Sequence, residues 1–305
     1  MLPPRMHEIL NDFYCPECEN NLILIKKNHE FDCENCHTHY SFKNHAPVLL
    51  SKQRQQRLNI NLSSNTGQQM FAEYENIKAQ KSNMTVKEQL IKFITPPKLM
   101  LHYNPDLALP ITSKLFNHQG TKTKILNVGG GPRRYSDQEI IMNIDSFHQV
   151  DLVADARNIP IKDNTFDSVF SIAVLEHIPN PQQAVKEMLR VLKPNGYLYA
   201  EIPFIYFFHG YPNDYQRFTK EGIRHLFKDL KAVEIGITEG SVSAVLQSLN
   251  MLLNLFLPVR FPIIKKIFNG IFRWLFFPLK YLDKLIAHKK NADILAGGFY
   301  IIGKK

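Results

Sequence analysis

Three absences narrow the classes of protein to which this chain of 305 residues can belong. Its first residues lack the basic start and apolar core of a signal peptide, so we expect a cytoplasmic protein. No uncharged apolar run reaches the roughly 18 to 20 residues that cross a bilayer, which argues against a transmembrane helix. Cysteine is scarce, and all four cysteines lie between Cys15 and Cys36, so no disulfide framework is expected.

Acidic residues are outnumbered by basic ones, 28 against 37, which gives a net charge of +9. This excess favours anionic partners such as RNA, phospholipid surfaces or phosphorylated glycans, and charge alone does not choose among them. Hydrophobic residues make up 44% of the chain, enough for one large domain and something smaller.

The cysteines form two Cys-x-x-Cys pairs, Cys15 with Cys18 and Cys33 with Cys36. Each pair turns tightly enough for two thiolates to meet one ion, and four thiolates complete the tetrahedral shell of structural zinc. The alternative interpretation is two unrelated pairs of reduced cysteines. His37 and His39 lie beside the second pair and could replace a ligand, although surface positions in a turn are the preferred interpretation. Four cysteines leave no open coordination position, so the expected zinc holds structure and performs no chemistry.

Residues 13–50 resemble the small zinc-ribbon proteins that partner tRNA and rRNA methyltransferases. The resemblance includes Tyr40, a turn and the segment Pro47-Val48-Leu49-Leu50. We therefore predict a zinc ribbon over residues 1–50. A linker with helices follows over residues 51–120, including a helix at residues 84–94 that stops before two prolines.

The segment 124–128 is an apolar run that ends in Gly129, Gly130 and Gly131, which is typical of a buried parallel strand entering a tight turn. Further strands are predicted at residues 139–145, 150–156, 166–172, 197–202, 232–237 and 297–303, with a helix at 182–192. This alternation predicts an α/β fold with a doubly wound, Rossmann-like sheet in a domain over residues 121–305.

Asp145 and Asp155 each end a predicted strand beside the glycine turn. Such acids suit a ligand with a ribose and an adenine, because one can accept both ribose hydroxyls and the other the adenine amine. The turn lacks the Gly-Lys-Ser/Thr ending of a P-loop, and Arg134 stands where a dinucleotide fingerprint needs glycine. An adenosine ligand without a chain of phosphates is therefore expected. The structural alternative is that these acids cap helices or face water.

Here the chain resembles class I S-adenosylmethionine-dependent methyltransferases, in the ubiquinone-biosynthesis-like branch. The resemblance includes the glycine motif, the two acids and the segments 159–167, 174–178 and 190–196. It implies a seven-stranded sheet whose last two strands form a hairpin, and it implies S-adenosyl-L-methionine as cofactor. The implied cofactor-binding residues are Asn127, Gly129, Gly130, Gly131, Asp145, Asp155, Ala156 and Ser171. Asn127 replaces the family's usual acid, and Pro132-Arg133 replaces a third glycine, so the helix after the turn is expected to be short.

Several residues after the fourth and fifth strands are predicted to lie on the acceptor side of the pocket. They are Glu176, His177, His209, Asp214, Tyr215 and Arg217. His177 and His209 are the candidate catalytic bases if the acceptor must lose a proton. The structural alternatives are that these histidines cap or pack, that Asp214 pairs with Arg217, and that Thr219 caps the helix at 220–227.

Residues 241–290 are predicted to be an insertion between the sixth and seventh strands, rich in large apolar residues interleaved with cations. This pattern is typical of helices that lie in a membrane interface and are attracted to anionic lipid. A helical lid or a dimer contact is an equal alternative.

The leading hypothesis is methyl transfer to a small, lipid-linked or glycan-type acceptor at the inner face of the membrane. RNA methylation is the alternative that the ribbon and the charge suggest, although the Asn/Asp-Pro-Pro-Tyr/Phe motif of nucleobase amine methylation is absent after the fourth strand. A third hypothesis is a catalytically weak binding subunit, suggested by Asn127. Removing zinc is expected to unfold residues 13–50 and leave the main sheet standing.

Overall fold

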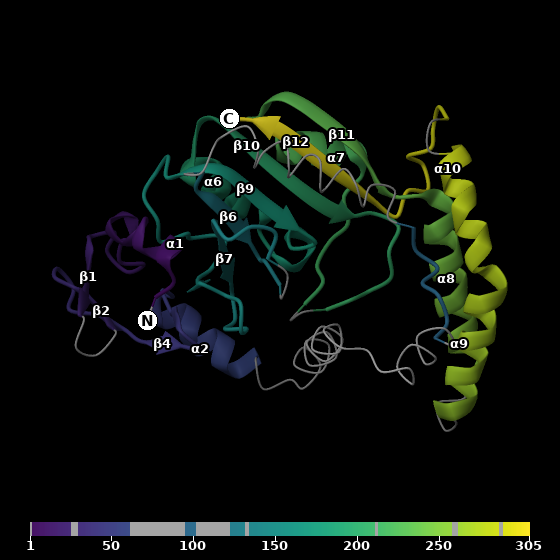
Figure 1. The fold of residues 1–305 in the computed structure, drawn as a ribbon, viewed down its shortest axis with the longest axis horizontal. Helices are drawn as coiled ribbons and strands as arrows, with labels where there is room; N and C mark the ends of the chain where they lie inside the picture. Colours follow the sequence, from purple (N-terminus) through teal and green to yellow (C-terminus); the bar gives the residue numbers. More distant parts are fainter. Residues whose placement is uncertain are drawn as a thin grey trace.

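The computed structural model describes residues 2–25, 30–61, 95–101, 123–131, 134–210, 213–257, 262–286 and 289–305. The helix expected at residues 84–94 lies outside these ranges. Within them, a small N-terminal module and a helical C-terminal segment lie at opposite ends of a central sheet (Figure 1).

The N-terminal module is built from short antiparallel strands around the cysteines. Its elements are α1 (Pro4–His7), η1 (Leu10–Asp12), β1 (Leu22–Ile25), β2 (Glu30–Cys33), β3 (His39–Tyr40), β4 (Phe42–Lys43) and β5 (Ala46–Pro47). The first three strands form one sheet in the order β1-β2-β3, and β4 pairs with β5. Strand β1 lies between the two cysteine pairs in the chain. The helix α2 (Lys52–Asn61) follows directly.

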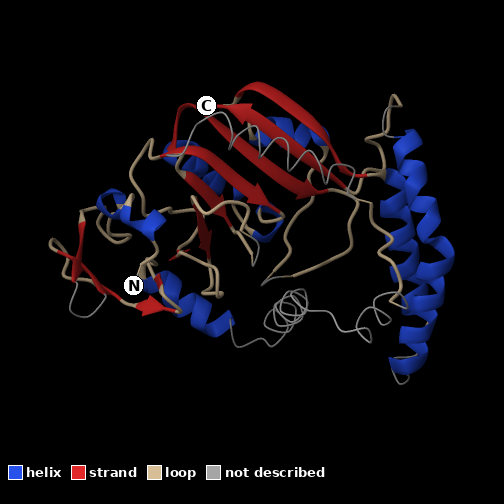
Figure 2. Cartoon of the chain, viewed as in Figure 1, coloured by secondary structure: helices blue, strands red, loops and turns tan. Residues whose placement is uncertain are grey.

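The central sheet has seven strands in the order β11-β12-β10-β9-β6-β7-β8 (Figure 2). The parallel strands are β6 (Ile125–Val128), β7 (Glu139–Asn143), β8 (Leu152–Val153), β9 (Phe166–Ile172) and β10 (Leu192–Pro203). The last two, β11 (Lys231–Glu239) and β12 (Gly298–Lys304), pair antiparallel with each other, and β12 also pairs antiparallel with β10. The predicted Rossmann-like α/β sheet and its terminal strand pair are confirmed.

Strands β9, β6 and β7 lie next to one another inside the sheet. Every residue of β6 and of β7 is buried, as strands covered on both faces require. The helices η3 (Leu175–His177), α6 (Pro181–Val191) and α7 (Lys220–Leu226) follow β9 and β10. Asn180 caps α6 and Thr219 caps α7, so the predicted cap of the second helix is confirmed.

The N-terminal module and the central sheet share one hydrophobic core. Phe13, Phe31 and Leu49 of the module belong to the same buried cluster as Leu126 and Met142 of the sheet. At the edge of the sheet, Val48 forms a parallel bridge with Val153 of β8, and the Leu49 N–H donates to the Val153 carbonyl at 2.9 Å. The module therefore extends and covers the β8 edge of the sheet.

The segment between β11 and β12 folds into helices α8 (Ser241–Leu255) and α9 (Pro262–Phe276), the 3₁₀ helix η4 (Phe277–Leu282) and α10 (Asp283–Ile286). Asp283 anchors this segment, because its buried carboxylate accepts the N–H groups of Val242 and Ser243 at 2.7 and 3.0 Å at the start of α8. Across α8 and α9, Asn254 and Asn269 exchange two side-chain hydrogen bonds. Among the helices that the structure describes, none is long and apolar enough to cross a membrane.

Candidate functional site

The glycine turn after β6 is tightly packed. Gly129 has φ of 75°, a conformation that residues with a side chain rarely adopt. A Cβ on Gly129 would lie 2.3 Å from the Val174 side chain, and a Cβ on Gly130 would lie 2.7 Å from that of Ile141. Both glycines are therefore required by the packing of the turn, and Val174 ties the turn to the acceptor-side segment after β9.

Asn127, which replaces the family's usual acid, is paired with a carboxylate from the neighbouring strand. Its amide donates to Glu139 Oε1 at 2.5 Å, and both side chains are buried. Burial raises the pKa of Glu139, while hydrogen bonds from the Tyr135 and Ser136 backbone and from Asn127 act to lower it. An aspartate at position 127 would place a second buried carboxylate against Glu139, which like-charge repulsion opposes.

Asp145, the predicted ribose acid, lies just beyond the end of β7 with 13% of its side chain exposed. Its Oδ1 accepts the Ser146 N–H at 2.7 Å. Lys43 of the N-terminal module approaches the same oxygen, with its Nζ at 3.4 Å. The module thus reaches the edge of the sheet where the ribose is expected.

Asp155, the predicted adenine acid, follows the neighbouring strand β8 and is held by two arginines. Arg157 donates to both carboxylate oxygens, at 3.1 and 2.7 Å, and Arg54 Nε of α2 lies 2.8 Å from Oδ2. Burial raises the pKa of Asp155, but Arg157 and Arg54 outweigh it, so the net pKa lies below the ordinary value. A cavity of about 300 Å³ opens beside these groups, lined also by Arg57, Asn158 and Gln183 among others.

The three remaining predicted cofactor residues lie along the same edge. Gly131 and Ala156 are partly exposed, next to the glycine turn and to Asp155 respectively. Ser171 is fully buried near the end of β9, and its hydroxyl makes no hydrogen bond to any described residue. The ends of β6, β7, β8 and β9 thus bring the predicted cofactor residues to one edge, as the carboxyl ends of parallel strands should.

Glu176, His177 and His209 form the acceptor-side cluster. Glu176 is completely buried in η3, and His209 comes from the loop after β10. The Nε2 atoms of His177 and His209 lie 3.7 and 3.5 Å from Glu176 Oε1. Burial lowers the pKa of His209, but Glu176, the Phe207 carbonyl and Asp214 outweigh it, and the net pKa is raised.

The loop that carries His209 is fixed by the predicted Asp214–Arg217 pair, which the structure confirms. Arg217 donates to both Asp214 oxygens, and Asp214 accepts the His209 N–H at 2.9 Å. Hydrogen bonding to Arg217 lowers the pKa of Asp214 to about 2. Tyr215 is 51% exposed, and its N–H donates to the Glu176 carbonyl at 2.9 Å. Asp214 and Arg217 therefore fix the His209 loop and also lie beside the His209 ring, while Tyr215 faces solvent.

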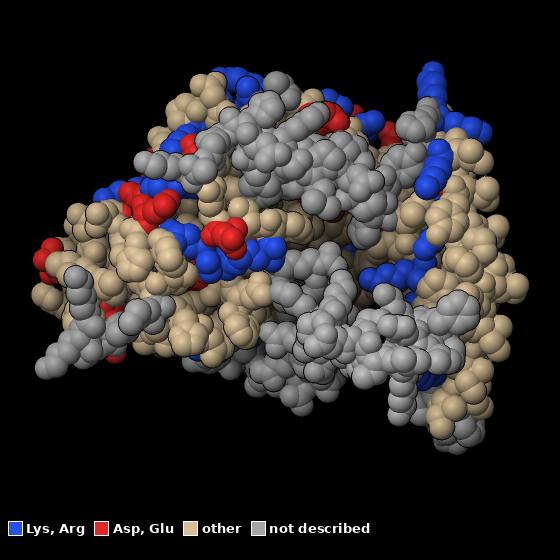
Figure 3. All heavy atoms as spheres, in the orientation of Figure 1, with Lys and Arg blue, Asp and Glu red and all other residues tan. Residues whose placement is uncertain are grey.

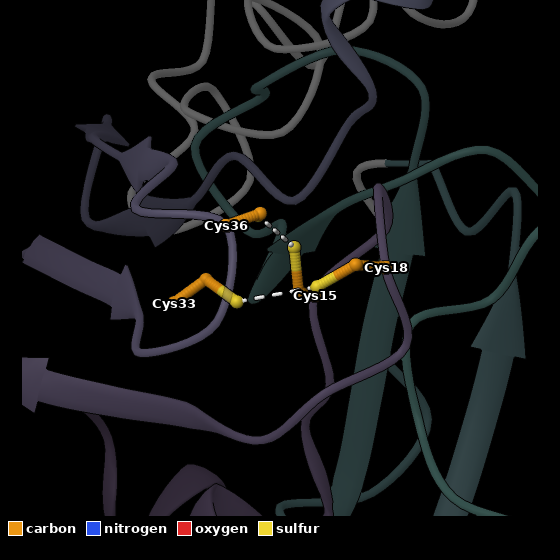
Figure 4. A group of neighbouring side chains, drawn as sticks. All are labelled: Cys15, Cys18, Cys33 and Cys36. Carbon is orange, nitrogen blue, oxygen red and sulfur yellow. Dashed lines mark hydrogen bonds between the residues drawn. The ribbon is translucent and has the colours of Figure 1, made fainter.

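The four cysteines converge as the sequence predicts (Figure 4). The Sγ atoms of Cys15 and Cys36 are 3.5 Å apart, and those of Cys18 and Cys33 are 3.4 Å apart. Four sulfurs about 2.3 Å from one tetrahedral ion are separated by about 3.8 Å, so the cluster fits zinc with a small expansion. The Tyr40 hydroxyl lies 3.0 Å from the buried Cys15 sulfur.

Sequence reasoning missed the residues that replace a helix after the glycine turn. Residues 134–138, the described part of this connection, contain no helix. Arg134 donates to the Gln149 carbonyl and to Asp151 Oδ2, each at 2.8 Å, and Asp151 also accepts from Arg5 at 2.6 Å. The signal that could have found them is an acid at the start of each of two apolar segments, Glu139 and Asp151.

Comparison with known proteins shows that part of the sheet domain is similar to methyltransferases. The family described as "Methyltransferase domain" matches residues 135–200, which include Asp145, Asp155 and Glu176. A sterol 4-C-methyltransferase of Caenorhabditis elegans is 37% identical over 75 residues, 25% of this chain and 21% of the relative. Norajmaline N-methyltransferase of Rauvolfia serpentina is 45% identical over 44 residues, 14% of this chain and 15% of the relative. The chain thus spans about a fifth or less of the length of these relatives.

Solved structures of methyltransferases are similar to this chain with low TM-scores. One of them is a protein of Thermotoga maritima described as a possible histamine N-methyltransferase. The match covers 63% of this chain and 86% of the Thermotoga chain, with 16% sequence identity and a TM-score of 0.37. The family match, together with the order of strands in the sheet, confirms the resemblance of this domain to class I methyltransferases.

Proposed function

We propose that the protein transfers a methyl group from S-adenosylmethionine to a small acceptor that is carried by a lipid or is of glycan type. The observation that supports methyl transfer is the shared edge of the sheet. The glycine turn, Asp145 and Asp155 lie at the ends of β6, β7 and β8, and Glu176 and His209 follow β9 and β10. A cofactor half and an acceptor half therefore lie side by side.

In this reaction, the sulfonium of the cofactor already activates its methyl group. The protein's task is to align the acceptor atom, the methyl carbon and the sulfur, and to exclude water. Asp145 holds the ribose and Asp155 the adenine, while the glycine turn allows the backbone to approach the cofactor. His177 and His209 are within reach of an acceptor that must lose a proton, and the Asp214–Arg217 pair keeps the His209 loop in place.

The acceptor class is inferred from the outer surface of α8 and α9. On α9, Ile263, Ile267 and Ile271 recur every four residues with exposures of 72, 57 and 63%. They form a single apolar stripe, and the middle of the right-hand edge in Figure 3, where these helices lie, is mostly uncharged on the face shown. Lys265 and Lys266 lie on the same helix. An apolar stripe on a helix that also carries cations suits the surface of a membrane that contains anionic lipid.

Two other cations of the helical segment between β11 and β12 make hydrogen bonds within the protein. Arg273 donates to the carbonyls of Pro96 and Pro97 at 2.5 and 2.9 Å, and Lys280 to the carbonyl of Lys98 at 2.8 Å. These cations hold residues 96–98 against α9 and η4. The membrane contact that we propose therefore depends on the isoleucine stripe with Lys265 and Lys266.

The cofactor assignment is tested by replacing Asp145 with alanine. Loss of a charge-assisted hydrogen bond to the ribose costs about 1.5 to 3 kcal/mol, so S-adenosylmethionine should bind about 10- to 100-fold more weakly in calorimetry. Asp229→Ala, at an exposed position after α7, is the matched control and should bind like the parent protein. Unchanged affinity in Asp145→Ala would remove this residue from the cofactor site. Failure of the parent protein itself to bind would favour the non-catalytic binding subunit.

The acceptor class is tested with methyl-labelled S-adenosylmethionine in an extract of the host. We expect label in the organic phase. Label that nuclease releases would instead identify RNA as the acceptor and the ribbon as its binding site.

Membrane contact is tested by flotation with vesicles containing phosphatidylserine. The double variant Ile267→Gln/Ile271→Gln should lose most vesicle binding with an unchanged melting temperature, because both side chains are already exposed. Ile23→Gln, at a 45% exposed isoleucine of the N-terminal module, should bind like the parent protein. Equal flotation of all three proteins would contradict the assignment of this surface.

A further inference from the structure

The acceptor-side cluster contains a buried carboxylate that its surroundings do not neutralise by hydrogen bonding. Glu176 has no exposed surface, and among the described residues neither of its carboxylate oxygens has a hydrogen-bond partner. Taking an ionised carboxylate out of water costs several kcal/mol unless a cation or good donors replace the lost solvation. The groups that face Oε1 of Glu176 are the Nε2 atoms of two histidines.

His177 presents a lone pair, rather than a proton, to this carboxylate when its ring is neutral. Its Nδ1 lies 2.7 Å from the carbonyl oxygen of Asn213, and a carbonyl can only accept. The proton of the neutral ring is therefore on Nδ1, and Nε2 carries the lone pair that points toward Glu176. A histidine whose Nδ1–H is held by a backbone carbonyl is the arrangement that orients Nε2 for a metal ion.

His209 is held in a similar way. Its Nδ1 lies 3.2 Å from the Phe207 carbonyl and 3.5 Å from Asp214 Oδ2, both acceptors. Arg217 Nη2 is 3.4 Å from the same nitrogen but is committed to closer bonds with Asp214 and Phe207. The rings of His177 and His209 meet edge to face with centroids 5.0 Å apart. The Nε2 atoms of both rings lie within 3.7 Å of Glu176 Oε1.

From these contacts we infer that Glu176, His177 and His209 bind a divalent transition-metal ion of the zinc type. One donor atom from each residue lies within 4.8 Å of the others, and the two nitrogen–oxygen separations are 3.5 and 3.7 Å. Donors about 2.1 Å from a tetrahedral ion are about 3.4 Å apart, so only a small closure is needed. Two imidazoles and one carboxylate are the donor set of ions such as Zn²⁺, Fe²⁺ and Co²⁺, and they leave coordination positions open.

Two of the three proposed metal ligands follow closely after a residue that packs on the glycine turn. Glu176 and His177 lie two and three residues after Val174, whose side chain packs on the Gly129 turn. An open coordination position could take water or an oxygen of the acceptor, and with both Nε2 atoms on the ion neither histidine would act as the base. That use rests on the proposed methyl transfer, whereas binding of the ion does not.

The experiment is a titration of the metal-free protein with Co²⁺, followed by absorption spectroscopy. Cobalt in the four-cysteine site gives strong sulfur-to-metal charge-transfer absorption, and cobalt bound by nitrogen and oxygen gives only weak visible bands. We expect a first equivalent with the sulfur signature and a second without it. Glu176→Gln and His209→Ala should each weaken the second equivalent by about 10- to 100-fold or more and leave the first unchanged.

His225→Ala, at an exposed histidine of α7, is the matched control and should retain both equivalents. Glu176→Gln preserves the shape of the side chain, so its melting temperature shows whether the fold is intact. Binding that ends at one equivalent, or a second equivalent that survives both variants, would overturn the inference and leave a protonated histidine as the neutralising group. Because no cofactor is present, this outcome is independent of whether S-adenosylmethionine binds.

Discussion

Removing the metal from the four-cysteine site, by chelation or by Cys33→Ser, is expected to destabilise the central sheet as well as the N-terminal module. The sequence alone predicts that only residues 13–50 unfold. In the structure, however, Phe31 and Leu49 share one buried cluster with Leu126 of the sheet. Loss of about 5 kcal/mol of metal-linked stability should lower the melting temperature of the whole chain by about 10 to 20 °C.

Hydrogen exchange, followed separately in β8 and β12, shows how far this effect spreads. Protection should fall in β8, which the module covers through Val48, and in its neighbour β7. Ile23→Gln, in the same module but exposed, is the matched control and should melt like the parent protein. A separate low-temperature transition with an unchanged main transition would show instead that the module folds on its own.

Replacing Gly129 with alanine is expected to abolish measurable cofactor binding and to lower stability by about 1 to 3 kcal/mol. Alanine at position 129 would have to adopt a φ of 75°, which residues with a side chain rarely adopt. Its Cβ would also lie 2.3 Å from the Val174 side chain. Calorimetry with S-adenosylmethionine and thermal unfolding measure the two effects.

Gly270→Ala is the matched control, because a Cβ there would meet only Pro96, at 3.4 Å, within the described residues. A helical position favours alanine by about 0.5 to 1 kcal/mol, so this variant should be neutral or stabilised. The double variant Gly129→Ala/Val174→Ala removes the contacts of 2.3 and 2.6 Å with the Val174 methyl groups and leaves one of 3.0 Å with its Cβ. It keeps the backbone strain, so it should recover only part of the stability. Cofactor binding by Gly129→Ala at parental affinity would show that the turn does not approach the cofactor.

Local patterns in the sequence were sufficient to predict the sheet and the convergence of the four cysteines. The strand ending at Val128, the acids Asp145 and Asp155 and the two Cys-x-x-Cys pairs are each encoded within a few residues. They depend on apolar runs, glycine conformation and ligand spacing, which are local properties.

Contacts between distant segments could not be predicted in the same way. Lys43 meets Asp145 across 102 residues, and Arg54 meets Asp155 only because α2 folds back over the end of β8. Glu176 and His209 were both predicted on the acceptor side, but no sequence pattern showed that His177 and His209 face one buried carboxylate. That arrangement depends on how the loop after β10 returns over η3, which tertiary packing decides.

The contact of Val48 with Val153 has a consequence for how the two parts assemble. A zinc-ribbon partner on a separate chain would dissociate on dilution, and its occupancy would follow its supply in the cell. Here the four-cysteine module and the sheet belong to one polypeptide, so their association is unimolecular and its strength does not depend on protein concentration. The ratio of module to sheet is therefore fixed at one to one in every copy of this chain.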